Sequence, residues 1–192
     1  MSNYLNSRQW TYKYLSPKEM ILGNIYRSVN NIILTYQQQK GTEDMATQIT
    51  NNLWLGNCQA AQNSNFLAEN NIHTIINVSN IHLHEYLFVD YKTFIIRDKD
   101  ACQENLLPLM ESAANVINEA ITQNKIVLVN CKRGHHRSAS IVVLYLMKYH
   151  NYSLEEALVM VKRIRPTSFR RMTCMLETLI NYEYQHILNQ LY

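Results

Sequence analysis

The stretch Ile126-Val-Leu-Val-Asn-Cys-Lys-Arg-Gly-His-His-Arg-Ser-Ala-Ser140 decides the fold class of this chain. Its first residues, Ile126–Asn130, form an apolar run that predicts a buried central β-strand. A short loop with one glycine follows, and the next periodic segment, Ser138–Tyr149, predicts a helix. A buried strand that leads through a tight loop into a helix is typical of a layered α/β domain.

Strands and helices alternate on both sides of this junction. Short apolar runs predict four further strands, and apolar residues at helical spacing predict four further helices. The expected strands are Ala46–Ile49, Leu53–Leu55, His73–Val78 and Lys92–Ile96, and the expected helices are Phe66–Asn70, Glu104–Gln123, Leu154–Ile164 and Thr178–Leu191. Ser153, with Glu156 three residues later, gives one of these helices a capping-box pattern. This alternation indicates an α/β domain in which helices cover a sheet.

The first 45 residues differ in pattern from the rest of the chain. Apolar side chains recur at helical spacing from Met20 onward, Ser16 suits the helix N-cap, and Pro17 suits its first turn. A chain of 192 residues suits one domain with an appended segment. We therefore predict an N-terminal helical extension at residues 1–45 and the main domain at residues 46–192. The extension either packs on this domain or forms a subunit contact in a homodimer.

Composition excludes several classes of protein. No apolar run approaches the roughly 18–20 residues needed to span a bilayer, and the first ten residues lack the apolar core of a secretion signal. A cytoplasmic location is therefore expected, with the four cysteines as reduced thiols. They are Cys58, Cys102, Cys131 and Cys174. Because no C-x-x-C pair occurs and the histidines are poorly spaced for a metal cage, no metal site is predicted.

Charge is distributed unevenly along the chain. The formal net charge is only +3, but residues 131–171 carry nine basic and two acidic side chains, a net charge of +7. The rest of the chain carries nine basic and thirteen acidic side chains, a net charge of −4. A positive block on a slightly negative body indicates an anionic ligand.

The loop after the central strand has the features of an anion site. Backbone N–H groups in such a loop turn inward, and the positive end of the following helix lies at the same point. Gly134 permits the tight backbone. Cys131 stands at the base of this cradle, where cations and N–H donors favour a nucleophilic thiolate, and Arg137 offers a planar fork for two phosphoryl oxygens. A lone cysteine at a strand end is usually structural, but the combination of strand, glycine, arginine and helix start favours a nucleophile.

The spacing Cys131-x5-Arg137, followed by Ser138, resembles the signature loop of protein tyrosine phosphatases. Three flanking stretches are similar to the small dual specificity phosphatases. They are Ile49-Thr-Asn-Asn-Leu-Trp-Leu-Gly-Asn57, Arg137-Ser-Ala-Ser140, and Ser153-Leu-Glu-Glu-Ala157 through Lys162-Arg-Ile-Arg-Pro166. The resemblance covers about residues 46–187 and implies an α/β fold with a central mixed, mostly parallel sheet flanked by helices. Tyr12-Lys-Tyr-Leu15 is also similar to the poxvirus enzyme of this family, for which a nuclear or virion-associated location is the alternative.

The resemblance implies a protein phosphatase that acts on phosphotyrosine and phosphoserine or phosphothreonine through a phosphocysteine intermediate. By motif position Cys131 is the nucleophile, Arg137 holds the transition state, and Ser138 stabilises the departing thiolate. The implied phosphate-binding residues are Lys132, Arg133, Gly134, His135, His136 and Arg137. The loop supplies the positive field, so no metal or other cofactor is expected. The implied partner is a phosphorylated protein substrate.

The general acid must come from another loop, because a phenolate or alkoxide leaving group needs a proton. The family places an aspartate after a strand and about six residues before the leucine that begins the next helix. Asp100 fits this spacing to Leu106, and Asp98 is the alternative. The other interpretation of both residues is a solvated loop charge.

The chain departs from the family in ways that leave other functions open. Asn130 stands where the family usually has the histidine that orders the loop, so a catalytically weak phosphate-binding module is one alternative. The basic loop interior resembles that of phosphatases that act on inositol pyrophosphates, and RNA 5′-triphosphate is a related substrate known among viral relatives. Four arginines after the loop either line the substrate approach or are solvated. They are Arg163, Arg165, Arg170 and Arg171.

Overall fold

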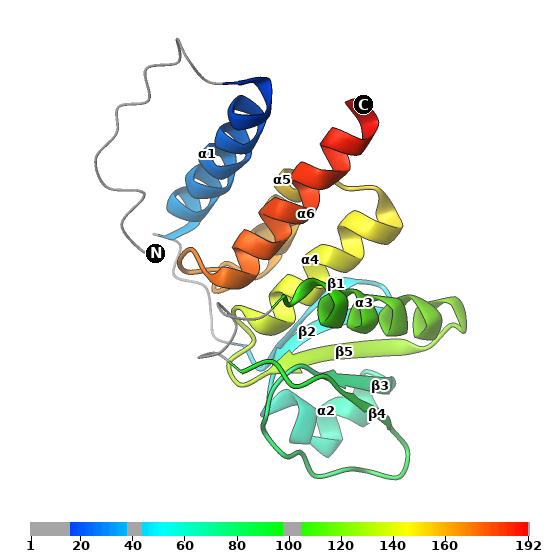
Figure 1. Cartoon of the computed structure of the whole chain (residues 1–192). Coiled ribbons are helices and arrows are strands. Elements are labelled where there is room, and N and C mark those ends of the chain that lie inside the picture. Colours follow the sequence, from blue (N-terminus) through cyan, green and yellow to red (C-terminus); the bar gives the residue numbers. More distant parts are fainter. Residues whose placement is uncertain (1–15, 38–43, 98–104, 192) are drawn as a thin grey trace.

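The computed structural model describes residues 16–37, 44–97 and 105–191, in which strands and helices follow one another (Figure 1). The strands are β1 (Ala46–Thr50), β2 (Leu53–Asn57), β3 (Ile72–Asn77), β4 (Asp90–Thr93) and β5 (Ile126–Cys131). The helices are α1 (Pro17–Gln37), the short 3-10 helix η2 (Ala60–Gln62), α2 (Ser64–Glu69), α3 (Leu107–Thr122), α4 (Arg137–His150), α5 (Leu154–Ile164) and α6 (Cys174–Leu191). Within these residues no helix is long and apolar enough to cross a membrane.

The strands form one sheet in the order β1-β2-β5-β3-β4. β1 and β2 are an antiparallel hairpin, whereas β2, β5, β3 and β4 run parallel. The predicted mixed, mostly parallel sheet is therefore confirmed, and β5 lies at its centre. The register places Asn57 of β2 opposite Cys131, and Asn77 of β3 opposite Asn130. Since the carboxyl ends of parallel strands lie at one edge of a sheet, three strand ends meet around Cys131.

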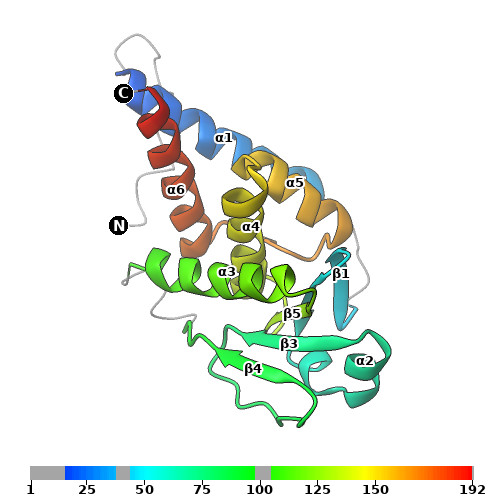
Figure 2. The same cartoon turned by 90° about the vertical axis from the view of Figure 1, so that its right-hand side faces the viewer.

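Helices cover the two faces of the sheet unequally (Figures 1 and 2). Successive side chains of β5 point to opposite faces. Val127 and Val129 join the larger core beneath α3, α4, α5 and α6, whereas Leu128 joins the smaller core beneath η2 and α2. α4 is the central helix of the thicker layer, and its residues 137–147 are all buried. The helix that begins at the loop is thus held by packing along most of its length.

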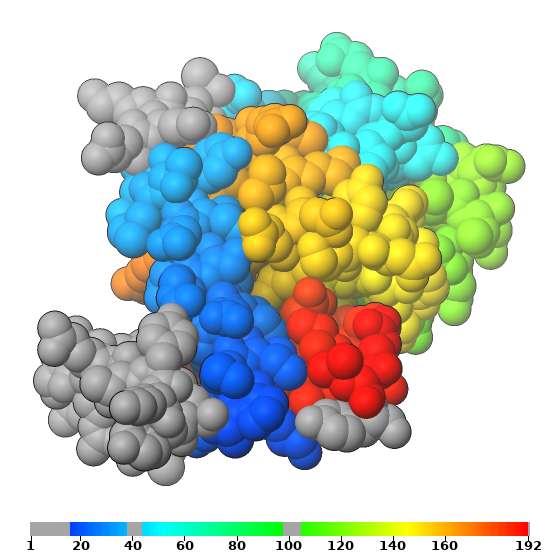
Figure 3. Space-filling model, turned by 90° about the horizontal axis from the view of Figure 1, so that it is seen from above, coloured from blue at the N-terminus to red at the C-terminus, as the bar shows by residue number. Residues whose placement is uncertain are grey.

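α1 packs against α5 and α6, on the side of these helices that faces away from the sheet (Figure 2). Val29, Ile32 and Ile33 of α1 belong to the larger core, and Figure 3 shows the helix along the molecular surface beside the end of α6. Ser16 and Glu19 form a capping box at its start. The interpretation of a helix that packs on the domain is confirmed. The domain boundary between residues 45 and 46 and the subunit contact stay predictions.

Most element boundaries differ from the sequence prediction by one or two residues, and three elements differ by more, β4, α3 and α6. The helix expected at Thr178–Leu191 is α6, which begins at Cys174. The strand expected at Lys92–Ile96 is β4, which ends earlier because its partner β3 ends at Asn77 and offers no further pairing. The helix expected at Glu104–Gln123 is α3, which begins at Leu107. Pro108 lies in its first turn, where the missing N–H of proline costs no helical hydrogen bond.

Candidate active site

Cys131 lies at the edge of the sheet to which the parallel strands point. It is the last residue of β5, and residues 132–136 form the loop that joins it to α4 at Arg137. Its side chain is 2% exposed. The junction therefore consists of the strand, tight loop and helix start that the sequence predicts.

Two donors contact the sulfur of Cys131. The backbone N of Gly134 donates to Sγ over 3.3 Å, and Oγ of Ser138 donates to the same atom over 3.3 Å. Ser138 is fully buried in the first turn of α4, so its hydroxyl is held in place. Both donors, together with the positive end of α4, are positioned to stabilise negative charge on the sulfur. The residues predicted as nucleophile and thiolate stabiliser are thus in direct contact.

Arg137 is the first residue of α4, and its side chain is 5% exposed. Its Nη1 donates to the carbonyl oxygen of Ile96 over 2.9 Å. Ile96 lies two residues before Asp98 and four before Asp100, the two candidates for the general acid. The hydrogen bond therefore connects the phosphate loop to the chain directly before these candidates. Asp98 and Asp100 themselves lie outside the described residues, and the assignment of the general acid stays a prediction.

The backbone of the loop requires glycine at position 134. Gly134 has a φ of +69°, a conformation that residues with a Cβ rarely adopt. A Cβ there would lie 2.7 Å from the carbonyl oxygen of Gly56 and 3.0 Å from Nη2 of Arg165. Because Gly56 presents backbone, no side-chain rotation can relieve the first contact. The loop therefore packs directly on the end of β2.

Arg165 braces the loop from its outer side. Its side chain is 3% exposed. Nε donates to the carbonyl oxygen of Gly134 (3.2 Å), Nη1 to Oγ1 of Thr47 (2.7 Å) and Nη2 to the carbonyl oxygen of Asp44 (3.0 Å). The carbonyl of Gly134 shares a trans peptide plane with the N–H of His135, so holding the oxygen outward turns this N–H inward. Arg165 is thus a buried brace of the anion cradle.

A backbone hydrogen bond holds the next peptide of the loop in the same way. N of Phe169 donates to the carbonyl oxygen of His135 over 2.9 Å, which turns the N–H of His136 inward. Phe169 is fully buried and has a φ of +49°, which is strained for an aromatic residue. Residues 165–169, which we call the bracing segment, therefore support two consecutive peptides of the loop.

A buried lysine holds the bracing segment in this shape. Lys162 of α5 is fully buried. Its Nζ donates to three carbonyl oxygens, those of Ser168 (2.6 Å), Pro166 (3.3 Å) and Phe169 (3.4 Å). The same atom lies 5.8 Å from the centroid of the Tyr36 ring on α1, within reach of a cation–π contact. Lys162 therefore connects α1 and α5 to the segment that supports the loop.

The pKa of Lys162 predicts how stability depends on pH. Burial, and to a lesser extent the nearby charge of Arg170, lowers this pKa from 10.5 to about 8. Between pH 8 and 10.5 the unfolded chain keeps a proton that the folded chain has lost, so this lysine makes the free energy of unfolding rise with pH in that window. We expect the stability of the wild type relative to Lys162→Met to increase by on the order of 2 kcal/mol between pH 7.5 and pH 10.

Urea denaturation of both proteins at the two pH values measures this difference. Lys18→Met, which makes the same substitution at an exposed position of α1, is the matched control. The interpretation of Lys162 as a buried ammonium would be contradicted by either of two results. In the first, the change with pH in the free energy of unfolding relative to wild type is the same for Lys162→Met as for Lys18→Met. In the second, Lys162→Met gains stability relative to wild type at high pH.

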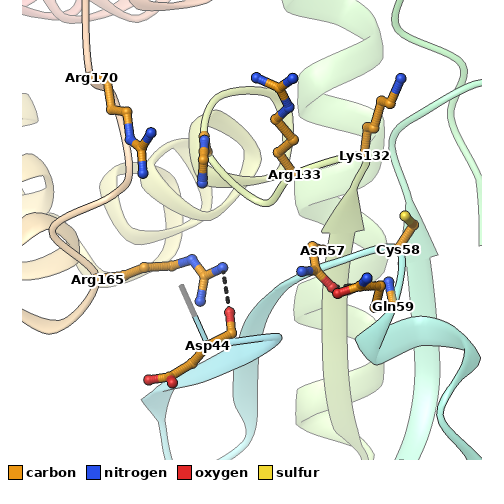
Figure 4. Close-up of a pocket in the computed structure, with 9 residues that line it drawn as sticks. Asp44, Asn57, Cys58, Gln59, Lys132, Arg133, Arg165 and Arg170 are labelled. Atoms are coloured by element: carbon orange, nitrogen blue, oxygen red, sulfur yellow. Dashed lines mark hydrogen bonds between the residues drawn. The ribbon is translucent and has the colours of Figure 1, made fainter. Parts of the chain in front are cut away.

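The side chains of the remaining predicted phosphate-binding residues lie in different surroundings. Lys132 and Arg133 are exposed, and neither forms an ion pair with a described residue. His135 is buried, and His136 is the N-cap of α4, with its ring edge-on to that of Phe169 at a centroid distance of 6.4 Å. These residues offer backbone N–H groups to the cradle, whereas the charges of Lys132 and Arg133 extend outward from it (Figure 4).

Asn130 directly precedes Cys131 and is fully buried. Neither Oδ1 nor Nδ2 has a hydrogen-bond partner among the described residues. A buried amide without partners destabilises the folded state. The departure from the usual histidine therefore leaves an unsatisfied polar group beside the candidate nucleophile.

The cysteines differ in their state. Cys58 and Cys131 are free thiols, whereas Cys174 is disulfide-bonded. The expectation that every cysteine is a reduced thiol is therefore wrong for Cys174. Cys102 lies outside the described residues.

Lys162 is a site residue that the sequence prediction did not identify. Arg165 was predicted either to line the substrate approach or to be solvated, whereas the structure buries it as a brace of the loop. The signal available was Pro166, which ends α5 and so fixes where the Arg165 side chain leaves the helix. Nothing in the local sequence shows which of the neighbouring charges becomes buried. Arg163 and Arg171 belong to the same group of arginines after the loop, and both are exposed.

Comparison with known proteins identifies the family. The family described as "Dual specificity phosphatase, catalytic domain" matches residues 53–185, which include the loop, the bracing segment and most of the helical layer. The chain belongs to the dual specificity phosphatases. It is thus a cysteine-based protein phosphatase, and the resemblance and function predicted from the sequence are confirmed. The kinship with the poxvirus enzyme stays a prediction.

Similar proteins in this family come from animals and plants. Dual specificity protein phosphatase 18 of Mus musculus is 35% identical over 139 residues, which cover 72% of this chain and 73% of the relative. Dual specificity protein phosphatase 1 of Arabidopsis thaliana is 37% identical over 128 residues, 66% of this chain and 63% of the relative. The crystal structure of human DUSP28 has a TM-score of 0.67 and 26% identity, and the match covers 76% of this chain and 96% of that one. A mouse dual specificity phosphatase complexed with zinc tungstate has a TM-score of 0.68 and 28% identity, with 80% and 97% covered.

Proposed function

We propose that Cys131 performs the protein phosphatase reaction of this chain through a phosphocysteine intermediate. The observation that carries the proposal is the position of its sulfur, 3.3 Å from both the backbone N of Gly134 and Oγ of Ser138 at the start of α4. A nucleophile in such an electropositive site splits phosphate ester hydrolysis into two easier displacements. Membership of the dual specificity phosphatase family supports this reaction.

In the first displacement the thiolate of Cys131 attacks phosphorus. An S–P bond forms, the P–O bond to the serine, threonine or tyrosine side chain breaks, and the leaving oxygen takes a proton from the general acid. In the second displacement water attacks phosphorus and gives a proton to the same, now ionised, carboxylate. The S–P bond breaks, inorganic phosphate leaves, and the hydroxyl of Ser138 stabilises the returning thiolate.

Arg137 and the inward N–H groups of the loop stabilise the oxygens of the transferring group. The guanidinium binds two of them in its planar fork, and its hydrogen bond to the carbonyl of Ile96 sets the orientation of the side chain. Donors that are fixed before the substrate binds need little reorganisation during the reaction. The braces from Arg165 and Phe169 serve this preorganisation.

We assign the general acid to Asp100, with Asp98 as the alternative. Asp100→Asn is expected to lower kcat roughly 100- to 1,000-fold on a phosphoserine peptide, because the alkoxide leaving group depends on the proton. The loss on p-nitrophenyl phosphate should be smaller, because its leaving group is a weak base. Steady-state kinetics of Asp100→Asn and Asp98→Asn measure the difference. A large loss in Asp98→Asn, with Asp100→Asn near wild type, would show that the assignment is wrong.

Phosphate release from a substrate panel tests the proposed function. The panel contains a phosphotyrosine peptide, a phosphothreonine peptide, an inositol polyphosphate and RNA with a 5′-triphosphate. The highest kcat/KM for the peptides supports the proposal, and a preference for either of the other substrates would replace it. A chain that binds the peptides but releases neither p-nitrophenol nor phosphate from p-nitrophenyl phosphate would be a phosphate-binding module.

A homodimer through α1 and a cytoplasmic location stay proposals. α1 packs on α5 and α6 within one chain, and it also exposes the apolar side chains of Met20 and Leu34, which offer surface to a second copy. Sedimentation equilibrium of the full chain measures the oligomeric state.

The cytoplasmic location is proposed from the sequence alone, and imaging of the tagged protein in cells tests it.

A further inference from the structure

The N-terminal helix α1 lies outside the part of the chain that matches the family. The match begins at residue 53, whereas α1 spans Pro17–Gln37. Its last turn nevertheless lies beside the segment between α5 and α6, which supports the phosphate loop at residues 132–136 (Figure 1). A helix from outside the matched domain is therefore next to the braces of the active site.

Packing along α1 fixes the position of this last turn. Ile32 and Ile33 are buried in the larger core, and Tyr36 packs against the same core. The spacing of these residues places them on one face of the helix. Earlier in α1, Oγ of Ser28 donates to Oε2 of Glu155 in the first turn of α5 over 2.5 Å. The side chain of Tyr36 is thus held on the face that α1 turns toward α5.

The ring of Tyr36 faces the buried ammonium of Lys162, with Nζ over the ring and 5.8 Å from its centroid. An ammonium has three N–H donors, and the carbonyl oxygens of three residues in the bracing segment accept from this one. Among the residues that the structure describes, no carboxylate forms an ion pair with Lys162. The negative face of the ring is therefore the group that stabilises this charge from the side of α1.

A second contact from α1 holds the chain directly after the bracing segment. Nε2 of Gln37 donates to the carbonyl oxygen of Arg170 over 3.1 Å. Phe169 precedes Arg170 and has a φ of +49°, which is strained for an aromatic residue. A strained backbone persists only where the surrounding contacts hold it. Gln37, and Tyr36 through Lys162, support the strained residue on its two sides.

Phe169 transmits this support to the phosphate loop. Its backbone N donates to the carbonyl oxygen of His135 over 2.9 Å, which turns the N–H of His136 toward the cradle. A donor that is fixed in this direction before the substrate binds stabilises the charge of the transition state with little reorganisation. A displacement of Phe169 would release this donor. A continuous series of contacts therefore connects the end of α1 with the cradle of the transferring phosphoryl group.

We propose that Tyr36 and Gln37 of α1 are positioning residues of the phosphatase reaction, which act through Lys162 and Phe169 on the N–H donors of the phosphate loop. The inference rests on the proposed function and gives the N-terminal helix a part in it. Both residues act through the bracing segment, and neither is assigned a contact with the substrate. Because fixed donors matter most in the transition state, their loss should change kcat more than KM.

Substitutions of two tyrosines of α1 in the full chain test the ring contact. Tyr36→Leu keeps an apolar side chain without the ring face, and its kcat on p-nitrophenyl phosphate is expected to fall about fivefold, with KM within about twofold of wild type. Tyr36→Phe keeps the face and should keep kcat within about twofold. Tyr26→Leu is the matched control, because Tyr26 also packs partly buried against the larger core but lies about 15 Å earlier along the helix. It should leave kcat within about twofold of wild type.

Inhibition constants separate positioning from a loss of folded protein, because they do not depend on the amount of active enzyme. Vanadate adopts the five-coordinate geometry of the transition state, whereas inorganic phosphate resembles the ground state. Tyr36→Leu should weaken inhibition by vanadate about fivefold and inhibition by phosphate less than about twofold. Gln37→Ala removes a hydrogen bond at an exposed position and should show the same pattern, with a loss of about threefold for vanadate and for kcat.

An unchanged kcat in folded Tyr36→Leu or in Gln37→Ala would overturn the inference. An equal loss in Tyr26→Leu would also overturn it, because α1 would then act only through overall stability. Circular dichroism and the thermal midpoint show whether each variant is folded, and Gln37→Ala decides alone if Tyr36→Leu does not fold. Failure of the proposed function gives a different result. A wild type that releases no p-nitrophenol contradicts the phosphatase reaction, whereas an active wild type with unaffected variants contradicts the positioning role alone.

Discussion

Turnover by the Cys131→Ser protein is expected to fall roughly a million-fold, the scale on which removal of a covalent nucleophile acts. Serine nearly preserves the shape of the side chain, but its hydroxyl is not ionised at neutral pH. The two donors that contact the sulfur at 3.3 Å would then face a neutral oxygen, which is a weak nucleophile without a base beside it. Steady-state and single-turnover assays with p-nitrophenyl phosphate measure the loss.

Substrate binding should survive this substitution, because the cradle consists of backbone N–H groups and Arg137 and does not depend on the sulfur. The Kd of Cys131→Ser for a phosphotyrosine peptide, measured by calorimetry, should therefore lie within about threefold of the wild-type value for a non-hydrolysable analogue. Circular dichroism and the thermal midpoint report whether the fold is kept. If serine disturbs the loop, Cys131→Ala provides a second variant without a nucleophile. Turnover above about 1% of wild type in a folded variant would show that Cys131 is not the nucleophile.

The centre of this fold could be predicted from the sequence because its signals are local. The apolar run Ile126–Asn130 marked the central strand, and Gly134 marked the tight loop that follows it. The helix predicted at Leu154–Ile164 agrees with α5 at both ends. A capping box of Ser153 and Glu156 fixes its start, and Pro166 prevents its continuation. Each of these features acts within a few residues, so pattern reasoning identifies it.

The braces of the loop could not be predicted, because they depend on contacts between distant parts of the chain. Arg165 reaches Thr47 and Asp44, which are 118 and 121 residues away in sequence. Lys162 is polar, and charged residues on an amphipathic helix are normally solvated. Only the packing of α1 over α5 and the path of the bracing segment bury it. The sequence shows the number of charges here, whereas tertiary packing decides which of them are internal.

The positive block at residues 131–171 divides into groups with different roles. Arg137 begins the helix that follows the phosphate loop. Lys162 and Arg165 are buried and brace the loop. Lys132, Arg133 and Arg170 are exposed and line a cavity beside the loop, to which Arg165 also contributes. Lys148 instead pairs with Glu111 of α3 at 3.2 Å. A charge count alone therefore overstates the cations available to a ligand, because two of them hold the loop in shape.

Arg137→Lys is expected to lower kcat roughly a thousandfold, with a much smaller effect on KM. Lysine keeps the positive charge, so attraction for the phosphate dianion in the ground state persists. It lacks the planar fork that binds two oxygens as phosphorus moves toward the sulfur. A single ammonium also cannot reproduce the 2.9 Å hydrogen bond to the carbonyl of Ile96 while it binds phosphate. Because the lost interaction is made mainly in the transition state, the loss appears in kcat.

Two controls separate the fork from the fold in this experiment. Arg171→Lys, the same change at an exposed position outside the cavity, should leave kcat and KM within about twofold of wild type. Guanidinium at millimolar concentration should restore part of the activity of Arg137→Ala, because the ion can enter the vacated space, and it should not restore Cys131→Ser. If Arg137→Lys kept more than about a tenth of the wild-type kcat, a point charge would suffice at this position, and the role of Arg137 as a bidentate transition-state clamp would be refuted.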